Sequence, residues 1–366
     1  MIHRRKQRTT SQERSDLFDG LPDDIILSIL SRLCSTARCP SDFVNILFTC
    51  KRLNRLGLHP LVLSKSGSKT FAIGAKNWSE QAHRFMKRCV AAGSVEACYT
   101  LGMIRFYCLQ NRGSGASLMA KAAIRSHAQS LYSLAVIQFN GSGGSKNQKD
   151  LRAGFALCGR AAYLGHVDAI RELGHCLQDG YGVRRNTAEG RRLLVQASAR
   201  ELASALRAVA PSALHVLKRQ LRNKRESNSN SSNLSLLSDF GLNNLNLPSE
   251  AHPVNRFLTE WFGLFNPDSG SDTGIRMCSN SGCGRPETRR NEFRRCSACG
   301  TVNYCSRACQ AQDWKMRHKG ECSPVAAAVV DALVMNNLDG GGDGFDDAVV
   351  DDRTDEVEGV GGGPSE

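Results

Sequence analysis

The sequence predicts a mainly α-helical protein built from several modules, and three observations lead to this prediction. Apolar residues recur at intervals of three and four along much of the first 222 residues, a spacing that places them on one face of a helix. Related segments return at offsets of 33 and 39 residues, which is typical of stacked helix pairs. Seven of the 15 cysteines fall within residues 278–322, where they indicate a small metal-stabilised module.

Composition excludes several classes of protein. The 366 residues are 41% hydrophobic and 6% aromatic, and no stretch approaches the ~20 apolar residues of a membrane span. The first eight residues are basic with no apolar run behind them, so we expect no signal peptide. We therefore expect a nuclear or cytoplasmic protein, or one found in both places. The run from Arg4 to Arg8 predicts either a nuclear localisation signal or a solvated tail.

Charge is distributed unevenly along the chain. The formal net charge is +13, but residues 323–366 hold 11 acidic residues against one arginine, so the first 322 residues carry +23. This balance indicates an anionic partner, or a tail that shields the body from one; the simpler alternative is a disordered, solubilising tail. We also expect disorder in the basic arm 1–16 and in the Ser/Asn-rich linker 223–250.

Residues 17–60 form the first predicted helical module. Pro22 suits the first turn of a helix, and Asp23 and Asp24 suit the positive end of its dipole. One apolar face follows, made of Leu21, Ile25, Ile29 and Leu33 with Ile26 and Leu30 beside them, and a second run has Phe43, Ile46, Leu47, Cys50, Leu53 and Leu56. About 40 residues cannot make a stable core alone, so we expect these faces to be buried against something else.

This module resembles an F-box. Residues 21–33 match the first helix of that family, and residues 48–56 match its closing "VCKxWxxL" motif with Leu53 in place of the aromatic residue, although the spacer 34–40 is long. The resemblance implies docking onto the Skp-type adaptor subunit of a cullin–RING ubiquitin ligase, with partner-binding positions at Leu21, Pro22, Ile25, Ile29, Leu30, Leu33, Leu47, Cys50 and Leu53. The alternative is an ordinary amphipathic hairpin of the main domain.

Residues 77–222 form the predicted repeat domain. The segment Glu96-Ala97-x3-Leu101-Gly102 returns in related form from Gln129 and from Asp168, and a Gly-rich turn follows each copy. A period near 36 residues with small residues at fixed helix positions predicts an α-solenoid; the alternative is a non-repetitive helical bundle. The third copy resembles Sel-one-like repeats, relatives of the tetratricopeptide class, which implies a concave face that receives peptides or proteins.

Residues 278–322 contain eight zinc-ligand residues in four pairs. The pairs are Cys278 and Cys283, Cys296 and Cys299, Cys305 and Cys309, and His318 and Cys322. Eight such donors satisfy two tetrahedral Zn²⁺ ions and leave no coordination position open for water, so we expect two structural zinc ions and not a catalytic one. In a module of about 45 residues, metal binding would supply most of the folding free energy.

The zinc module resembles a MYND finger. The resemblance rests on Tyr304-Cys305-x3-Cys309 followed by Asp313-Trp314, His318 and Cys322. It implies interleaved ligands, with Cys278, Cys283, Cys305 and Cys309 on one ion and Cys296, Cys299, His318 and Cys322 on the other. The first pair is two residues wider than usual. The family implies a protein-interaction module that often binds short Pro-containing peptides.

No catalytic arrangement is evident in the sequence. His127, His166 and His175 occupy repeat or exposed positions, and no Ser-His-Asp set, phosphate-binding loop or carboxylate pair is defensible. The combination of modules resembles a set of plant F-box proteins. It implies a non-catalytic adaptor that docks onto the ligase through the F-box and holds a target through the repeats and the finger. The alternatives are a nuclear transcriptional or chromatin co-regulator that uses the finger for protein contacts, and an enzyme such as a methyltransferase. We expect neither nucleic-acid nor membrane binding.

Overall fold

The computed structural model describes residues 18, 20–209, 251–265 and 274–323. The predictions for the arm 1–16, the segment 210–222, the linker 223–250 and the tail from residue 324 lie outside the described residues. The described part is mainly helical, as predicted, with one small antiparallel sheet. No helix in these ranges has the length and apolar character needed to cross a bilayer.

The first module contains four short helices, α1 (Asp23–Thr36), α2 (Pro40–Leu47), α3 (Lys51–Gly57) and α4 (Pro60–Leu63). Pro22 precedes α1, and the two aspartates lie in its first turn, as predicted. Ile26, Leu30 and Phe43 are buried between these helices. Their core continues into Phe71 of the 3₁₀ turn η1 (Ser68–Phe71), so the module is joined to the following chain and is not a separate body.

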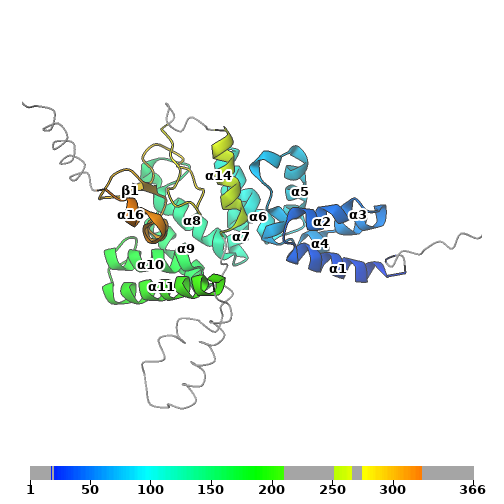
Figure 1. The fold of residues 1–366 in the computed structure, drawn as a ribbon, viewed down its shortest axis with the longest axis horizontal. Helices are drawn as coiled ribbons and strands as arrows, with labels where there is room; N and C mark the ends of the chain where they lie inside the picture. The colour runs from blue at the N-terminus through cyan, green and yellow to red at the C-terminus, as the bar shows by residue number, and fades with distance from the viewer. Residues whose placement is uncertain (1–17, 19, 210–250, 266–273, 324–366) are drawn as a thin grey trace, which may run out of the picture. The chain divides into compact units, whose positions relative to one another are not determined.

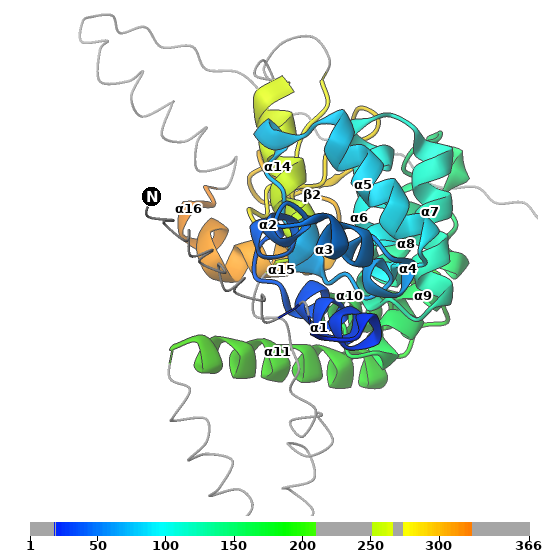
Figure 2. The same ribbon diagram turned by 90° about the vertical axis from the view of Figure 1, so that its right-hand side faces the viewer.

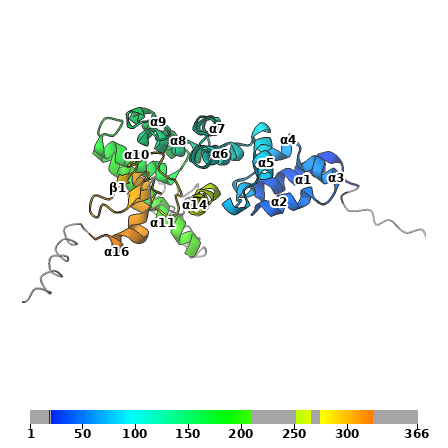
Figure 3. The same cartoon turned by 90° about the horizontal axis from the view of Figure 1, so that it is seen from above.

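The repeat domain consists of three helix pairs stacked in chain order (Figures 1 and 3). After η2 (Ala75–Asn77) and α5 (Glu80–Ala91), the pairs are α6 (Val95–Met103) with α7 (Arg112–Ile124), α8 (Ala128–Asn140) with α9 (Leu151–Tyr163), and α10 (Val167–Asp179) with α11 (Thr187–Val209). The connections contain the π-helical turn η3 (Ile104–Cys108) and the 3₁₀ turn η4 (Lys146–Gln148). Each predicted repeat motif lies in the first helix of its pair.

Glycines set the close approach of the helices within two of the pairs. A Cβ on Gly115 would lie 2.7 Å from the carbonyl oxygen of Gly102, and a Cβ on Gly190 would lie 2.8 Å from that of Gly174. Contacts this short exclude any side chain at these positions. The glycines at the ends of the first and third predicted motifs therefore allow α6 to touch α7 and α10 to touch α11.

A polar side chain caps the N-terminus of the first helix in every pair. Ser94 Oγ accepts a hydrogen bond from the Ala97 N–H at 3.1 Å, and Nδ1 of His127 and of His166 accept the equivalent bonds at 3.2 and 3.3 Å. These N-caps satisfy backbone donors that would otherwise have no partner. Both histidines thus have a structural role as N-caps.

The remaining elements cover the inner side of the stack. They are α14 (Pro253–Phe265), the strands β1 (Arg294–Arg295) and β2 (Asn303–Tyr304), α15 (Arg307–Asp313), the π-helical turn η6 (Trp314–His318) and α16 (Lys319–Glu321). The strands pair antiparallel, with Arg294 opposite Tyr304. Figure 2 shows α7 and α9 on the outer side of the row formed by α6, α8 and α10, and α14 and α15 on its inner side.

Candidate metal centres and the surface that holds them

The first predicted ligand set comes together in the structure. Cys278, Cys283, Cys305 and Cys309 are buried, and their Sγ atoms all lie within 4.8 Å of one another. The Sγ atom of Cys305 lies 3.5 Å from that of Cys283 and 3.6 Å from that of Cys309. The wider first pair is accommodated by a turn in which the Cys283 N–H donates to the Asn280 carbonyl at 2.9 Å.

The second predicted set also comes together. Cys296, Cys299, His318 and Cys322 place one donor atom each within the same 4.8 Å limit. The Sγ atoms of Cys296 and Cys322 are 4.0 Å apart, and Cys299 Sγ lies 3.6 Å from His318 Nε2. Cys296 and Cys299 belong to the turn between β1 and β2, where the Cys296 N–H donates to the Val302 carbonyl at 3.0 Å.

These spacings fit tetrahedral zinc and exclude disulfides. Four sulfur ligands at about 2.3 Å from a tetrahedral ion lie about 3.8 Å from one another, close to the separations above. A disulfide would need about 2.05 Å, and all 15 cysteines are free thiols in this structure. Hydrogen bonds among the four thiols hold the pKa of Cys283 well below its usual range and raise that of Cys278 and Cys309, because without a metal the four buried groups cannot all be ionised together. The residues present therefore match two zinc ions.

One continuous helical segment serves both sites. Cys309 lies on α15 and His318 lies at the end of η6, nine residues further along. The residues between them include the π-helical turn η6, and the two side chains reach different ligand sets. The hairpin of β1 and β2 also contributes to both sites. Cys296 and Cys299, in its turn, belong to the second ligand set, and Cys305, directly after β2, belongs to the first. The interleaved ligand order follows from this geometry.

The first zinc site is anchored to the repeats by a buried arginine. Arg285 is 5% exposed. Its Nη1 donates to Cys283 Sγ at 3.4 Å, and its Nη2 donates to Ser133 Oγ on α8 at 2.8 Å. The guanidinium also lies 5.8 Å from the centre of the Tyr132 ring. A fixed cation beside four thiolates offsets the negative charge of the zinc–thiolate group.

Further hydrogen bonds join the finger to α8 and α10. The Asn140 side chain donates to the Cys305 carbonyl at 2.8 Å, and the Tyr132 hydroxyl donates to Ser306 Oγ at 3.0 Å. The Glu172 carboxylate accepts the N–H of Ala308 at 3.1 Å. Because these are the first helices of their pairs, the finger of the same chain occupies the concave face that the repeat resemblance predicts to receive peptides or proteins.

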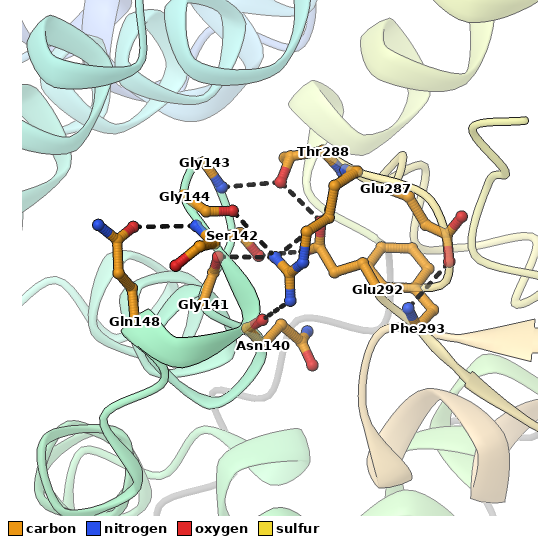
Figure 4. Close-up of polar contacts among 12 residues, drawn as sticks. Asn140, Gly141, Ser142, Gly143, Gly144, Gln148, Glu287, Thr288, Glu292 and Phe293 are labelled. Atoms are coloured by element: carbon orange, nitrogen blue, oxygen red, sulfur yellow. Dashed lines mark hydrogen bonds and ion pairs between the residues drawn. The ribbon is translucent and has the colours of Figure 1, made fainter. Parts of the chain in front are cut away.

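The loop before the hairpin holds the Gly-rich turn after α8 (Figure 4). The Gly143 N–H donates to Thr288 Oγ1 at 2.7 Å, and Ser142 Oγ donates to the Glu292 carboxylate. The Arg289 guanidinium donates to the Gly141 carbonyl at 2.7 Å. The turn after α8 therefore contributes directly to positioning the finger.

The inner face of the first pair is covered by α14. Glu96 on α6 lies between two histidines, with Oε1 3.2 Å from His127 Nε2 and Oε2 3.2 Å from His252 Nε2. Burial alone would raise the pKa of Glu96, but the hydrogen bonds from both histidines outweigh it and hold the pKa at about 2. His252 directly precedes α14, so an ionised carboxylate fixes this helix to the repeats.

Arg285, Tyr132, Ser133 and the residues around His252 are not predicted as site residues from the sequence. Their partners lie far away in the chain, and no local motif marks them. One signal was present: α8 has no charged residue between Ala128 and Asn140. A helix without a polar face must be covered on all sides, and the finger is what covers the side away from α9.

The predicted partner positions of the first module fall into three groups. Pro22, Ile25, Ile29 and Cys50 are exposed, and Leu21, Leu33 and Leu53 are partly buried against the core. Leu30 and Leu47 are only 3% and 9% exposed, so their assignment to a free partner surface is wrong. The reason is that an amphipathic helix presents an apolar stripe wide enough to pack inward and still leave apolar residues at its edge.

Comparison with known proteins agrees with this architecture. A family model for the MYND finger matches residues 278–322, and a model for plant tetratrico peptide repeats matches residues 68–159. A Sel1 repeat protein of known structure from Oxalobacter formigenes aligns over 64% of this chain and 96% of its own, with 13% identity and a TM-score of 0.36. A likeness of that size has no bearing on function. The two tetrads of the MYND finger are the sites of two zinc ions.

Two curated relatives are similar over most of the chain. An F-box protein of Arabidopsis thaliana is 64% identical over 313 residues, which cover 85% of this chain and 82% of the relative. A second F-box protein of the same plant is 58% identical over 325 residues, which cover 88% of this chain and 90% of the relative. The chain therefore belongs to this family of plant F-box proteins with helical repeats and a MYND finger, as its sequence predicts.

Proposed function

We propose that this protein is a non-catalytic substrate-recognition subunit of a Skp–cullin–F-box-type ubiquitin ligase. It would dock onto the Skp-type adaptor through the first module and hold a target near a ubiquitin-charged enzyme that other subunits recruit. The contribution to the reaction is effective concentration, which needs no active site in this chain. Membership of the F-box family supports the proposal, and one structural observation carries it.

That observation is the apolar surface left open on α1. Ile25 and Ile29 lie one turn apart on the same face and remain 45% and 44% exposed. The core of the module is already filled by Ile26 and Leu30 of the same helix. Burying these two isoleucines against a partner would stabilise the complex by roughly 1–3 kcal/mol in total. We therefore assign them to the surface that contacts the adaptor.

A further exposed apolar side chain, Phe48, lies next to the start of α3, and polar contacts fix the start of α3 beside α1. The Arg52 guanidinium on α3 donates to the Leu21 carbonyl at 2.5 Å and forms an ion pair with Asp23 at 2.7 Å. These bonds fix the start of α3 beside the start of α1. Phe48, in the turn before α3, is 81% exposed. The surface offered to an adaptor thus includes α1 and the α2–α3 turn.

Target binding must use other surfaces than the inner side of the repeats. In the described residues, the first helices α6, α8 and α10 contact α14 and the finger, as shown above. The outer helices and the open side of the finger remain. Trp314 and Met316 on η6 are 39% and 85% exposed there.

The test is binding of the purified full chain to a purified plant Skp-type adaptor. We expect Ile25→Glu with Ile29→Glu to weaken binding at least about tenfold, because each change places a charge in an apolar interface. Ile124→Glu is the matched control, since Ile124 is a 75% exposed isoleucine on α7. Both variants should keep the thermal midpoint of the wild type. Unchanged adaptor binding by the double variant would refute the proposal.

A further inference from the structure

Three loops that are far apart in sequence meet on one side of the molecule. They are residues 140–152, which join α8 to α9 and include the ends of both helices, residues 179–186, which join the end of α10 to α11, and residues 288–295 of the finger, which include β1. Arg289 donates a hydrogen bond to the Gly141 carbonyl of the first loop, and the Arg294 guanidinium lies 5.5 Å from the centre of the Tyr181 ring. Gly182 approaches Leu151 so closely that a Cβ would lie 2.3 Å from its carbonyl oxygen. We call this surface the basic patch.

Positive charge is concentrated in these three loops. They contain nine basic and three acidic residues, so 29 of the first 322 residues carry six of the 23 net positive charges. The three carboxylates are already engaged. Glu292 is fully buried beside Arg289 and Thr288, Asp179 forms an ion pair with Arg307, and Asp150 caps α9 through the Ala153 N–H.

The exposed cations of the patch lie close enough to repel one another electrostatically. Lys146 and Lys149 are both exposed. Partial burial, followed by the charges of Arg289, Lys146 and Arg294, lowers the pKa of Lys149, while Glu292 acts in the opposite direction. Crowded like charges destabilise a fold. An anionic ligand would relieve this repulsion.

Part of the patch is fixed in place before any ligand arrives. The Tyr181 ring lies 5.5 Å from the Arg294 guanidinium and 5.6 Å from that of Arg307. A guanidinium held against an aromatic ring loses less conformational entropy when it binds a carboxylate or phosphate group. Tyr181 is itself only partly exposed beneath these two groups, and Phe293 is buried. The described part of the patch therefore offers no open aromatic face on which a nucleic-acid base could stack.

We propose that the basic patch binds an extended acidic peptide segment of the target protein. The inference rests on the proposed function only in taking the bound protein to be the ligase target. Charge complementarity supplies the recognition, with Lys146, Lys149 and Arg294 as the cations that face the ligand. The patch lies on the repeats and the finger, and none of its loops belongs to the first module, which would bind the adaptor.

The test is direct binding of fluorescent probes to the full-length protein, followed by fluorescence anisotropy. The probes are a twelve-residue peptide of glutamate and aspartate, its glutamine and asparagine counterpart, and a DNA duplex of equal charge. Of the three probes, we expect only the acidic peptide to bind tightly. The Lys146→Glu with Lys149→Glu variant should bind this peptide about tenfold more weakly, or weaker still. Lys146→Arg with Lys149→Arg should bind as the wild type does.

A matched variant separates the patch from general electrostatics. Lys87→Glu with Lys121→Glu makes the same change in net charge at exposed lysines on α5 and α7, outside the patch. This control should keep peptide affinity within about twofold, because exposed charges beyond a Debye length are screened. Equal losses in both double variants would overturn the proposal. So would undiminished peptide binding by the Lys146 and Lys149 variant, or tighter binding of the duplex than of the peptide.

Adaptor binding is measured on the same preparations. If the proposed function fails, the wild type does not bind the adaptor whatever the peptide result. If only the basic patch is misassigned, adaptor binding remains and peptide binding does not depend on Lys146 and Lys149. The two failures are therefore distinguishable.

Discussion

Arg285 shows how much of this fold depends on single side chains between modules. It is a buried cation whose counter-charges are the thiolates of the first zinc site, chiefly Cys283 at 3.4 Å. Its second anchor is Ser133 in the middle of α8. Burying a guanidinium is unfavourable unless its charge is compensated; the thiolates compensate it and both Nη groups are bonded, while Nε has no hydrogen-bond partner among the described residues. The pair of anchors therefore makes the position of the finger on the repeats specific.

We expect Arg285→Leu to lower the free energy of unfolding by about 2–4 kcal/mol, because the zinc–thiolate group would lose its buried counter-charge. Zinc should also leave the protein faster in competition with a chromogenic chelator. Arg295→Leu is the control, since Arg295 is exposed and donates only to Asn291 among the contacts of its side chain described in the structure. Equal stability of the two variants in denaturant titrations monitored by circular dichroism would contradict this role.

At the scale of the element, the first helix of each pair begins with a capping side chain whose chemistry differs between pairs. Ser94 carries no proton that titrates near neutrality, whereas His127 and His166 must present an unprotonated Nδ1 to accept their N–H. Burial, followed by the charge of Arg285, lowers the pKa of His166 to about 3. The cap of α10 therefore depends on a neutral imidazole.

We expect His166 to make the protein less stable in mild acid. Its pKa is about 3 when folded and about 6.5 when unfolded, so the unfolded state binds the proton first and stability falls as the pH drops below 6.5. Between pH 7 and pH 5 this amounts to about 1–2 kcal/mol. His166→Asn keeps a capping oxygen without the titration. Its unfolding free energy should fall less over this interval, and parallel curves for the two proteins would rule out the mechanism.

At the scale of the whole molecule, the finger and the repeats form one packed body. The described residues up to Cys322 belong to a single unit, and α8 is enclosed by α9 on one side and by the finger on the other. A helix buried on all sides loses partners when either neighbour unfolds. We therefore expect zinc to stabilise the repeats as well as the finger.

Zinc removal tests this coupling. Elemental analysis should find about two zinc ions per chain in the wild type and in Cys50→Ser, and about one in Cys278→Ser. After chelation, hydrogen exchange should accelerate in α8 and α10 as well as in the finger, because their inner faces are uncovered. Helices α1–α4 contact neither zinc site and should keep their protection. Unchanged exchange in α8 would show that the repeats fold independently of the metal.

The modules and their local chemistry could be predicted from the sequence because each depends on residues that are close in the chain. The cysteine spacing predicts both ligand sets, and the four-residue interval from Leu21 to Leu33 predicts α1. The small residues at Gly102 and Gly174 predict close helix pairs even though the repeat offsets are uneven. Spacing along a helix or a hairpin determines which side chains share a face.

The relation between the modules was decided only by the tertiary structure. Arg285 and Ser133 are 152 residues apart, and Glu96 and His252 are 156 residues apart, so no periodicity connects them. Leu30 and Ile29 are both apolar neighbours in one helix, and only packing shows that the first is core and the second is surface. The sequence determined the local elements and the metal chemistry because those follow from backbone geometry and donor type. Which faces remain free for partners depends on what each element packs against, and this is set by the whole chain at once.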